Sequence, residues 1–247
     1  MVNFYPEQNY FRLDYSLDAC LQSGDRILTA PQFAQARIEN SELFLQWTRV
    51  LSLRLGCKVD GKPTALYWHP KINNPDDLRG LVSELKSWYA QGLTDTGALK
   101  VPRARYLDLL AQAKSQESNS RSLWYISDKA LHLSQSNSFC LNLVLWTTEI
   151  VPFLGSVDLA QRYIAKSLEI GRNSIGVLQI KSDSYSEDPQ GRVLIFGNNY
   201  VYIDLITNDG YDDNWRFAGV PFSAADTEKI SPPEENSFLA ELLSKRE

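Results

Sequence analysis

The run RVLIFGNNYVYIDLI, residues 192–206, constrains the fold more than any other stretch of the chain. Two apolar segments flank residues 197–199, a Gly-Asn-Asn triplet that tolerates the positive backbone angles of a tight hairpin turn. Alternation in the second segment places Tyr200 and Tyr202 on one face and apolar residues on the other. The run therefore predicts an antiparallel hairpin in a sheet, one face of which carries hydroxyl groups.

A second pair of strands is predicted near the amino-terminal end. In VLSLRL, Val50–Leu55, the three leucines alternate with other residues and should face the core. We expect neighbouring strands at Glu42–Trp47 and, after the turn DGK, at Thr64–Trp68. Further on, LWYISDKALHL (123–133) is predicted as two short strands around Asp128–Lys129, and CLNLVLWTTEI (140–150) as a central strand.

Helices are predicted by capping residues together with apolar spacing. Asn74 is a good N-cap, Pro75 suits the first helical position, and the following helix should end near Gly92. Three more helices are expected: one ending at Gly24, one beginning after Pro102, and one running from Val157 to Ile170 behind a Ser156 cap.

These elements predict an α+β protein with an antiparallel or mixed sheet and packed helices. A chain of 247 residues is long enough to bury a sizeable core. The polar segment KSQESNSRS, residues 114–122, is the best candidate for a boundary. We therefore expect two α+β halves, 1–115 and 122–247, the second of which carries acidic hairpins.

Charge is distributed unevenly along the chain. The net charge is −5, which excludes a strongly basic nucleic-acid footprint over the whole chain. From Arg49 to Arg121, 12 Lys/Arg face 7 Asp/Glu, a net charge of +5, and from Asp183 to Glu235 the count is 3 against 11, a net charge of −8. The densest basic spot is KVPRARY, and we predict phosphate contacts there for Lys100, Arg103 and Arg105.

No catalytic machinery is evident in the sequence. The two histidines, His69 and His132, stand alone, and no nucleophile elbow or glycine-rich phosphate loop is present. The turn NDGYDDN, residues 208–214, is rich in carboxylates but lacks the register of a calcium loop, so the pattern favours a turn over a metal site. We predict no catalytic residue, no metal ligand and no cofactor.

Aromatic residues offer a more specific hypothesis. Tyr, Trp and Arg are enriched where proteins bind one another. The carboxyl-terminal ribbon combines them, and we predict an interface formed by Tyr200, Tyr202, Trp215, Arg216 and Phe217.

Three cysteines, with spacing that suits neither a zinc site nor a disulfide framework, are typical of a reducing compartment. No apolar run approaches the length of a membrane span, and the amino terminus lacks the pattern of a signal peptide. We therefore expect a cytoplasmic protein that does not enter a membrane.

Two short motifs carry a resemblance to a known family. AQARIENSELFLQW, through Ala36, Arg37, Glu42, Leu43 and Trp47, is similar to a pattern of the small accessory subunit of type III-D CRISPR effector complexes. NNYVYIDLITNDGYDDNWRFAGV resembles the closing segment of that family; the residues that carry this match are Tyr200, Asp204, Arg216, Phe217 and Gly219. The resemblance implies a non-catalytic protein that packs against RNA-binding subunits.

The sequence thus favours a non-catalytic accessory or interaction subunit of a larger complex, with a protein partner and RNA as a further partner within the complex. Two other classes stay open. One is a metal-dependent or acid–base enzyme, such as a nuclease or hydrolase, that uses the acidic carboxyl-terminal half. The other is a protein that binds a small ligand between sheet and helix.

Overall fold

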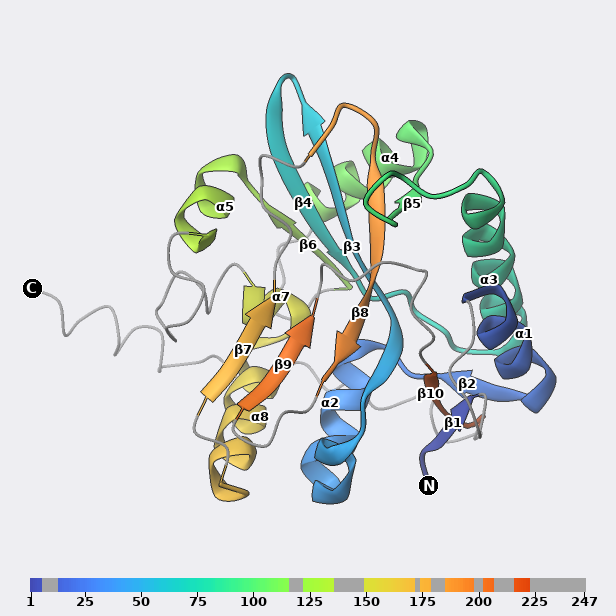
Figure 1. Ribbon diagram of the computed structural model, residues 1–247, viewed down its shortest axis with the longest axis vertical. Helices are drawn as coiled ribbons and strands as arrows, with labels where there is room; N and C mark the ends of the chain where they lie inside the picture. Colours follow the sequence, from blue (N-terminus) through green and yellow to red (C-terminus); the bar gives the residue numbers. More distant parts are fainter. Residues whose placement is uncertain are drawn as a thin grey trace, which may run out of the picture.

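The computed structural model describes residues 1–5, 13–115, 122–135, 149–171, 174–178, 185–197, 202–206 and 216–222. Helices pack on both faces of one mixed sheet, which confirms the predicted α+β class (Figure 1). Its strands are β1 (Asn3–Tyr5), β2 (Asp25–Ile27), β3 (Thr48–Val59), β4 (Lys62–Trp68), β5 (Leu99–Lys100), β6 (Leu123–Ile126), β7 (Ser174–Leu178), β8 (Gln190–Phe196), β9 (Tyr202–Ile206) and β10 (Phe217–Pro221).

The sheet has the order β1-β10-β3-β8-β9-β7, with β2 beside β10, β4 beside β3, β6 beside β4 and β5 beside β8. Most pairs are antiparallel, including the predicted pair β8–β9, whereas β10–β3 and β7–β9 are parallel. In the β8–β9 pair Phe196 lies opposite Leu205, so the predicted tight turn at residues 197–199 is wrong in register. Strand β3 of the range 1–115 pairs with β8 and β10 of the range 122–247. The two ranges therefore contribute to one sheet and do not form separate sheets.

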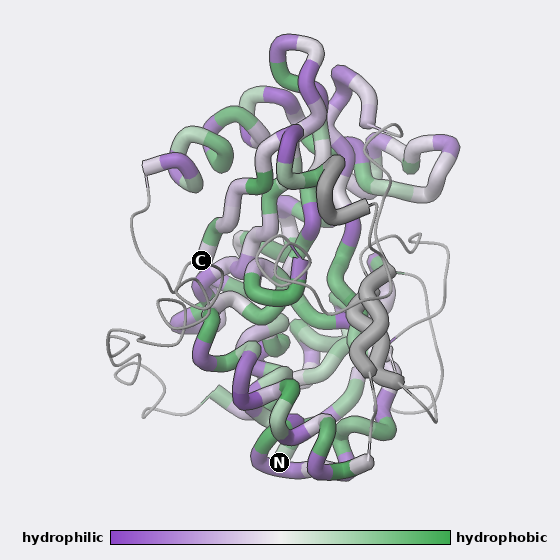
Figure 2. The backbone as a smooth tube through the Cα atoms, turned by 90° about the vertical axis from the view of Figure 1, so that its left-hand side faces the viewer, coloured by the Kyte–Doolittle hydropathy of each residue, from purple (hydrophilic) through white to green (hydrophobic). Residues whose placement is uncertain are grey.

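Two groups of helices cover the two faces of the sheet. The helices are α1 (Leu13–Ser23), α2 (Ala30–Glu39), α3 (Pro75–Ala90), α4 (Arg103–Ser115), α5 (Asp128–Gln135), α7 (Val151–Leu154) and α8 (Val157–Glu169), with a 3-10 helix η1 (Ser41–Leu45). Helices α1, α3 and α4 pack with one face of β3 in one hydrophobic cluster. Helices α2, α7 and α8 pack with the other face in a second cluster. Figure 2 shows hydrophobic segments through the centre of the molecule and hydrophilic ones at outer turns.

Strand β3 is buried on both faces. Leu51, Leu53 and Leu55 lie in the cluster of α1, α3 and α4, as predicted. The opposite face of the strand carries Ser52 and Arg54, which are also completely buried. A buried polar group is stable only when it is hydrogen-bonded, so this face of the sheet requires internal partners.

The capping residues set the helix ends as predicted. Asn74 accepts hydrogen bonds from the backbone N–H groups of Asp76 and Asp77 at the start of α3. Ser156 accepts from Leu159 N at the start of α8, and Gly24, after α1, has a φ of 72°. Such side chains satisfy backbone donors that a helix leaves open at its first turn.

Two predicted strands are helical in the structure. Residues 42–45 of the predicted strand Glu42–Trp47 lie in the 3-10 helix η1, which Asn40 caps by accepting from Glu42 N. Leu43 and Phe44 are both buried, which neighbouring residues on a strand achieve only between two covered faces. The segment after β6 is α5, capped by Ser127, which accepts from Ala130 N. Only the first of its two predicted strands, β6, is present.

Several predictions lie outside the described residues. These are most of the central strand at 140–150, most of the boundary at 114–122 and the acidic turn at 208–214.

Candidate functional site

The predicted interface residues do not share one exposed surface in the described part of the chain. Phe217 is fully buried between the sheet and α1, so it is a core residue and presents no ring to a partner. The Arg216 guanidinium lies 4.4 Å from the Phe4 ring centroid and donates to Gln46 Oε1. Phe217 is buried because its strand, β10, is an inner strand between β1 and β3.

The other three predicted interface residues are placed only by the backbone, or not at all. Tyr202 begins β9, which pairs with β7 and β8. Tyr200 and Trp215 lie outside the described residues. The prediction for this ribbon therefore rests on sequence.

Two of the three predicted phosphate contacts already have internal partners. Arg105 Nε lies 2.8 Å from Glu84 Oε1 and its Nη2 lies 3.4 Å from Glu84 Oε2, while its guanidinium stacks 5.1 Å from the Trp68 ring centroid. Arg103 donates to the carbonyl of Glu187. Of the three, only Lys100 lacks such a contact among the described residues, and its side chain is exposed. A phosphate at this spot would compete with existing carboxylate and carbonyl partners.

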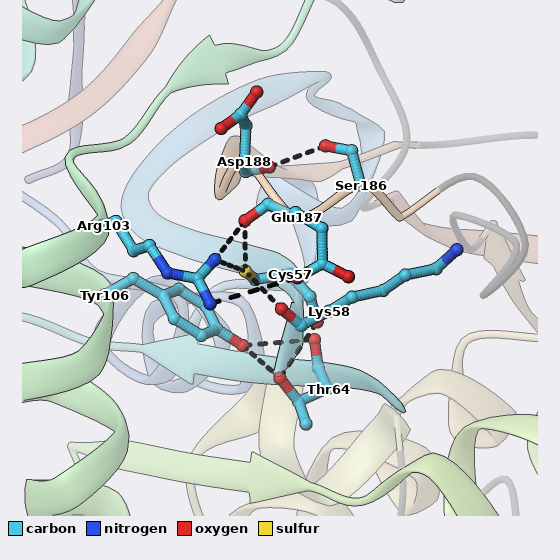
Figure 3. A network of polar contacts seen from close by, with 8 residues as sticks. All are labelled: Cys57, Lys58, Thr64, Arg103, Tyr106, Ser186, Glu187 and Asp188. Carbon is cyan, nitrogen blue, oxygen red and sulfur yellow. Dashed lines mark hydrogen bonds and ion pairs between the residues drawn. The ribbon is translucent and has the colours of Figure 1, made fainter. Parts of the chain in front are cut away.

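Arg103 belongs to a network that ties α4 to the β3–β4 hairpin (Figure 3). Cys57 Sγ lies 3.1 Å from the carbonyl of Glu187 and 3.6 Å from Arg103 Nη1. On the neighbouring strand, Thr64 Oγ1 is 2.6 Å from Tyr106 Oη. Burial raises the pKa of the Cys57 thiol. A protonated thiol is a poor nucleophile, so this network stabilises the fold and does not activate the sulfur.

A cluster of charged and phenolic groups lies at the centre of the sheet. Arg54 Nη2 is 3.3 Å from Glu149 Oε1, and both side chains have no exposed surface. Tyr67 donates to the other carboxylate oxygen of Glu149, and Arg54 donates to Tyr185 Oη. Burial raises the pKa of Tyr67 and Tyr185, and the charge of Glu149 adds to both shifts. The four groups pair with one another within the core, and only Arg54 Nε among their described polar atoms is buried without a hydrogen-bond partner.

His69 is the second buried titratable group on this face. Its Nδ1 lies 2.8 Å from Ser52 Oγ and its Nε2 lies 2.7 Å from the carbonyl of Pro152. Because a carbonyl only accepts, Nε2 carries the proton and Nδ1 accepts from the Ser52 hydroxyl, which itself accepts from Ala30 N. Burial lowers the pKa of His69 to about 4. The neutral imidazole thus links β3, β4 and α7. His132 lies in α5.

An open groove lies at the tip of the β3–β4 hairpin, which turns through Asp60 (φ 53°) and Gly61 (φ 73°). Its volume is about 480 Å³. The lining side chains come from this hairpin, from the end of α4, and from β6 with the start of α5: Val59, Asp60, Lys62, Thr64, Lys114, Tyr125, Ser127, Asp128 and Lys129. The Lys114 ammonium lies 5.0 Å from the Tyr125 ring centroid.

Sequence reasoning missed both the central cluster and the groove. A signal for the cluster existed, since Arg54 stands inside the apolar run VLSLRL and Glu149 stands next to IVPF. A charge within an apolar run indicates a buried partner of opposite sign. The lysines of the groove, Lys62, Lys114 and Lys129, are dispersed, so no local pattern unites them.

The described residues show neither a candidate metal site nor a membrane-spanning helix. Among those residues, no group of three or more His, Cys, Asp or Glu side chains is placed to hold a metal ion. Within the same ranges, no helix has both the length and the apolar character needed to cross a membrane.

Comparison with known proteins identifies the fold. No protein-family model matches the chain, and no curated protein matches it. One solved structure superposes on the chain with a TM-score of 0.66. Its description reads "Accommodation of massive sequence variation in Nanoarchaeota by the C-type lectin fold". It is 23% identical and covers 89% of this chain and 97% of its own. The chain therefore has a C-type lectin fold.

Proposed function

We propose that the chain is a non-catalytic binding protein, an accessory subunit that contacts a protein partner through its carboxyl-terminal ribbon. One observation carries the proposal: the described groups best suited to catalysis are engaged inside the core. Glu149 is occupied by Arg54 and Tyr67, and His69 by Ser52 and the Pro152 carbonyl. A general base must reach the proton it removes, and these groups are shielded from any substrate.

The structural neighbour supports the same proposal. Its C-type lectin fold accommodates massive sequence variation. A fold whose core is fixed by internal pairs can change its surface at little cost, which suits a recognition scaffold. The resemblance to the type III-D CRISPR subunit would make the partners RNA-binding proteins of one assembly, with RNA reached through that assembly.

We place this subunit in the cytoplasm. The two described cysteines, Cys20 and Cys57, are free thiols, as is usual in a reducing compartment. We also propose that the protein does not bind a membrane.

The test is co-purification of the tagged chain from the cells that make it, with protein and RNA identified by mass measurement and sequencing. The double variant Tyr200→Ala/Trp215→Ala should lose the protein partner by at least about tenfold, because interface aromatics carry most binding energy. The matched control, Leu45→Ala/Leu168→Ala, removes two side chains that are 57% and 58% exposed elsewhere on the surface.

Two kinds of result would contradict the proposal. One is a chain that elutes as a monomer with no stoichiometric partner, or a partner retained equally by both double variants. The other is a rise in melting temperature with manganese or magnesium, since a ligand that binds the native state stabilises it. That rise would favour a metal-dependent enzyme.

A further inference from the structure

We propose that the groove at the β3–β4 hairpin tip binds a phosphate monoester of an organic molecule that also carries hydroxyl or amine groups. This inference goes beyond the protein partner of the carboxyl-terminal ribbon, because the groove is built from β3, β4, α4, β6 and α5. The groove proposal and the protein-partner proposal can fail independently, because they concern different residues.

The groove gathers positive charge from three elements. Lys62 follows the hairpin turn, Lys114 lies in the last turns of α4, and Lys129 lies in the first turn of α5. All three are exposed, and within the part of the chain that the structure describes none forms an ion pair. Three ammonium groups that form no ion pair with a described residue and line one concavity are suited to a multiply charged anion such as phosphate.

This arrangement differs from the basic spot predicted from sequence. Arg103 and Arg105, at the other end of α4, are engaged by Glu187 and Glu84. The charge that is available to a ligand therefore lies near Lys114, at the carboxyl-terminal end of the same helix. There it also offsets the negative end of the helix dipole.

The rest of the lining defines the organic part of the ligand. Asp60 and Asp128 bring two carboxylates to the same groove and leave it a net charge of +1. These carboxylates can accept hydrogen bonds from hydroxyl or amine donors on a ligand. Val59 and the Tyr125 ring supply apolar wall, and a volume of about 480 Å³ is larger than a bare phosphate ion requires. Organic ligands occupy cavities of roughly 300–1,000 Å³.

Such a phosphate monoester has two sources, a free nucleotide or the phosphorylated end of an RNA. Calorimetric titration of the full chain with AMP and with a 5′-phosphorylated RNA oligonucleotide separates them. Binding of AMP assigns the groove to a free nucleotide, and binding of the oligonucleotide alone assigns it to an RNA end. Adenosine and the unphosphorylated oligonucleotide are the matched probes without the phosphate.

The variant Lys62→Gln/Lys114→Gln/Lys129→Gln should bind the phosphorylated probe roughly 30-fold more weakly, because exposed charge pairs contribute little each but add over three contacts. The control Lys71→Gln/Arg79→Gln/Lys100→Gln removes the same charge outside the groove and should bind normally. Both variants change exposed side chains, so unchanged melting temperatures are expected.

The proposal is overturned if neither phosphorylated probe binds, or if the unphosphorylated probes bind equally well. Equal weakening in the two variants would overturn it too, since net charge and not this groove would then govern binding. Loss of binding in the control alone would move the phosphate to the region of Lys100. None of these outcomes bears on the Tyr200 and Trp215 variant, which tests the protein partner.

Discussion

Arg54 and Glu149 form an ion pair of 3.3 Å between Nη2 and Oε1, in which neither side chain has any exposed surface. The pair joins the long strand β3 to the segment that leads into α7, 95 residues further along the chain. Two charges removed from water attract one another strongly but each carries a large desolvation cost. The pair therefore stabilises the contact between β3 and the segment before α7 only while both partners are present.

Replacement of Glu149 by Gln should destabilise the protein by about 3 kcal/mol or more, because Arg54 would stay charged and buried with no counter-charge. The measurement is urea unfolding at neutral pH. The control is Asp76→Asn, which breaks the exposed pair with Arg79 (66% and 85% exposed) and should cost less than about 1 kcal/mol. Equal costs for the two variants would show that the core does not depend on the buried pair.

Acidification should lower stability through His69. Burial lowers its pKa in the folded state to about 4, against 6.5 for an ordinary histidine. Between these pH values the unfolded chain binds a proton that the folded chain does not, so the free energy of unfolding falls as pH falls from about 6.5 to about 4. The full loss approaches about 3 kcal/mol.

The check is a series of urea unfolding curves between neutral pH and pH 4, compared with those of His69→Gln. Glutamine can keep a donor toward the Pro152 carbonyl but does not titrate, so its slope with pH should be shallower. Identical slopes for the two proteins would remove His69 as the cause.

Elements with strong local signals were predictable from the sequence. The Asn74 cap and the apolar spacing behind it predicted α3. The two apolar segments around residues 197–199 predicted the antiparallel β8–β9 pair, but not its register, in which Phe196 lies opposite Leu205. At Ser41–Leu45 the apolar content suggested a strand, but the Asn40 cap favours a helical turn. A local cap favours a helical turn, whereas apolar content favours a strand. Which of the two prevails depends on tertiary contacts that a short stretch of sequence does not show.

The sites were harder to predict because their residues are distant in sequence. Arg54 and Glu149 each stand in an apolar run, which indicates burial but not which charge meets which. Phe217 looked like a ribbon residue because nothing local shows that β10 is inserted between β1 and β3. Pairing of remote strands depends on the whole topology.

Gly155 should tolerate a side chain less well than Gly171. Both have left-handed backbones, with φ of 83° and 81°. A Cβ on Gly155 would lie 2.6 Å from Pro31 Cγ, whereas nothing lies within 4 Å of one on Gly171. We expect Gly171→Ala to cost about 1 kcal/mol for backbone strain alone, and Gly155→Ala about 3 kcal/mol because Pro31 and α2 must also shift. Thermal unfolding of the two variants measures the difference, and equal melting temperatures would contradict the close packing of α7 on α2.

The described thiols should be inert in the folded protein. Cys20 and Cys57 are completely buried, and burial raises the pKa of both. Thiol reagents attack the thiolate, so both low access and low ionisation slow the reaction. In a Cys140→Ser variant, which leaves only these two thiols, a chromogenic disulfide reagent should release almost no signal at pH 8 in buffer and two equivalents in concentrated urea. Rapid reaction of one thiol in buffer would point to Cys57, since the charge and the hydrogen bond of Arg103 oppose the rise of its pKa. The additional change Arg103→Gln should then slow that reaction, and an unchanged rate would exclude the network in Figure 3 as its cause.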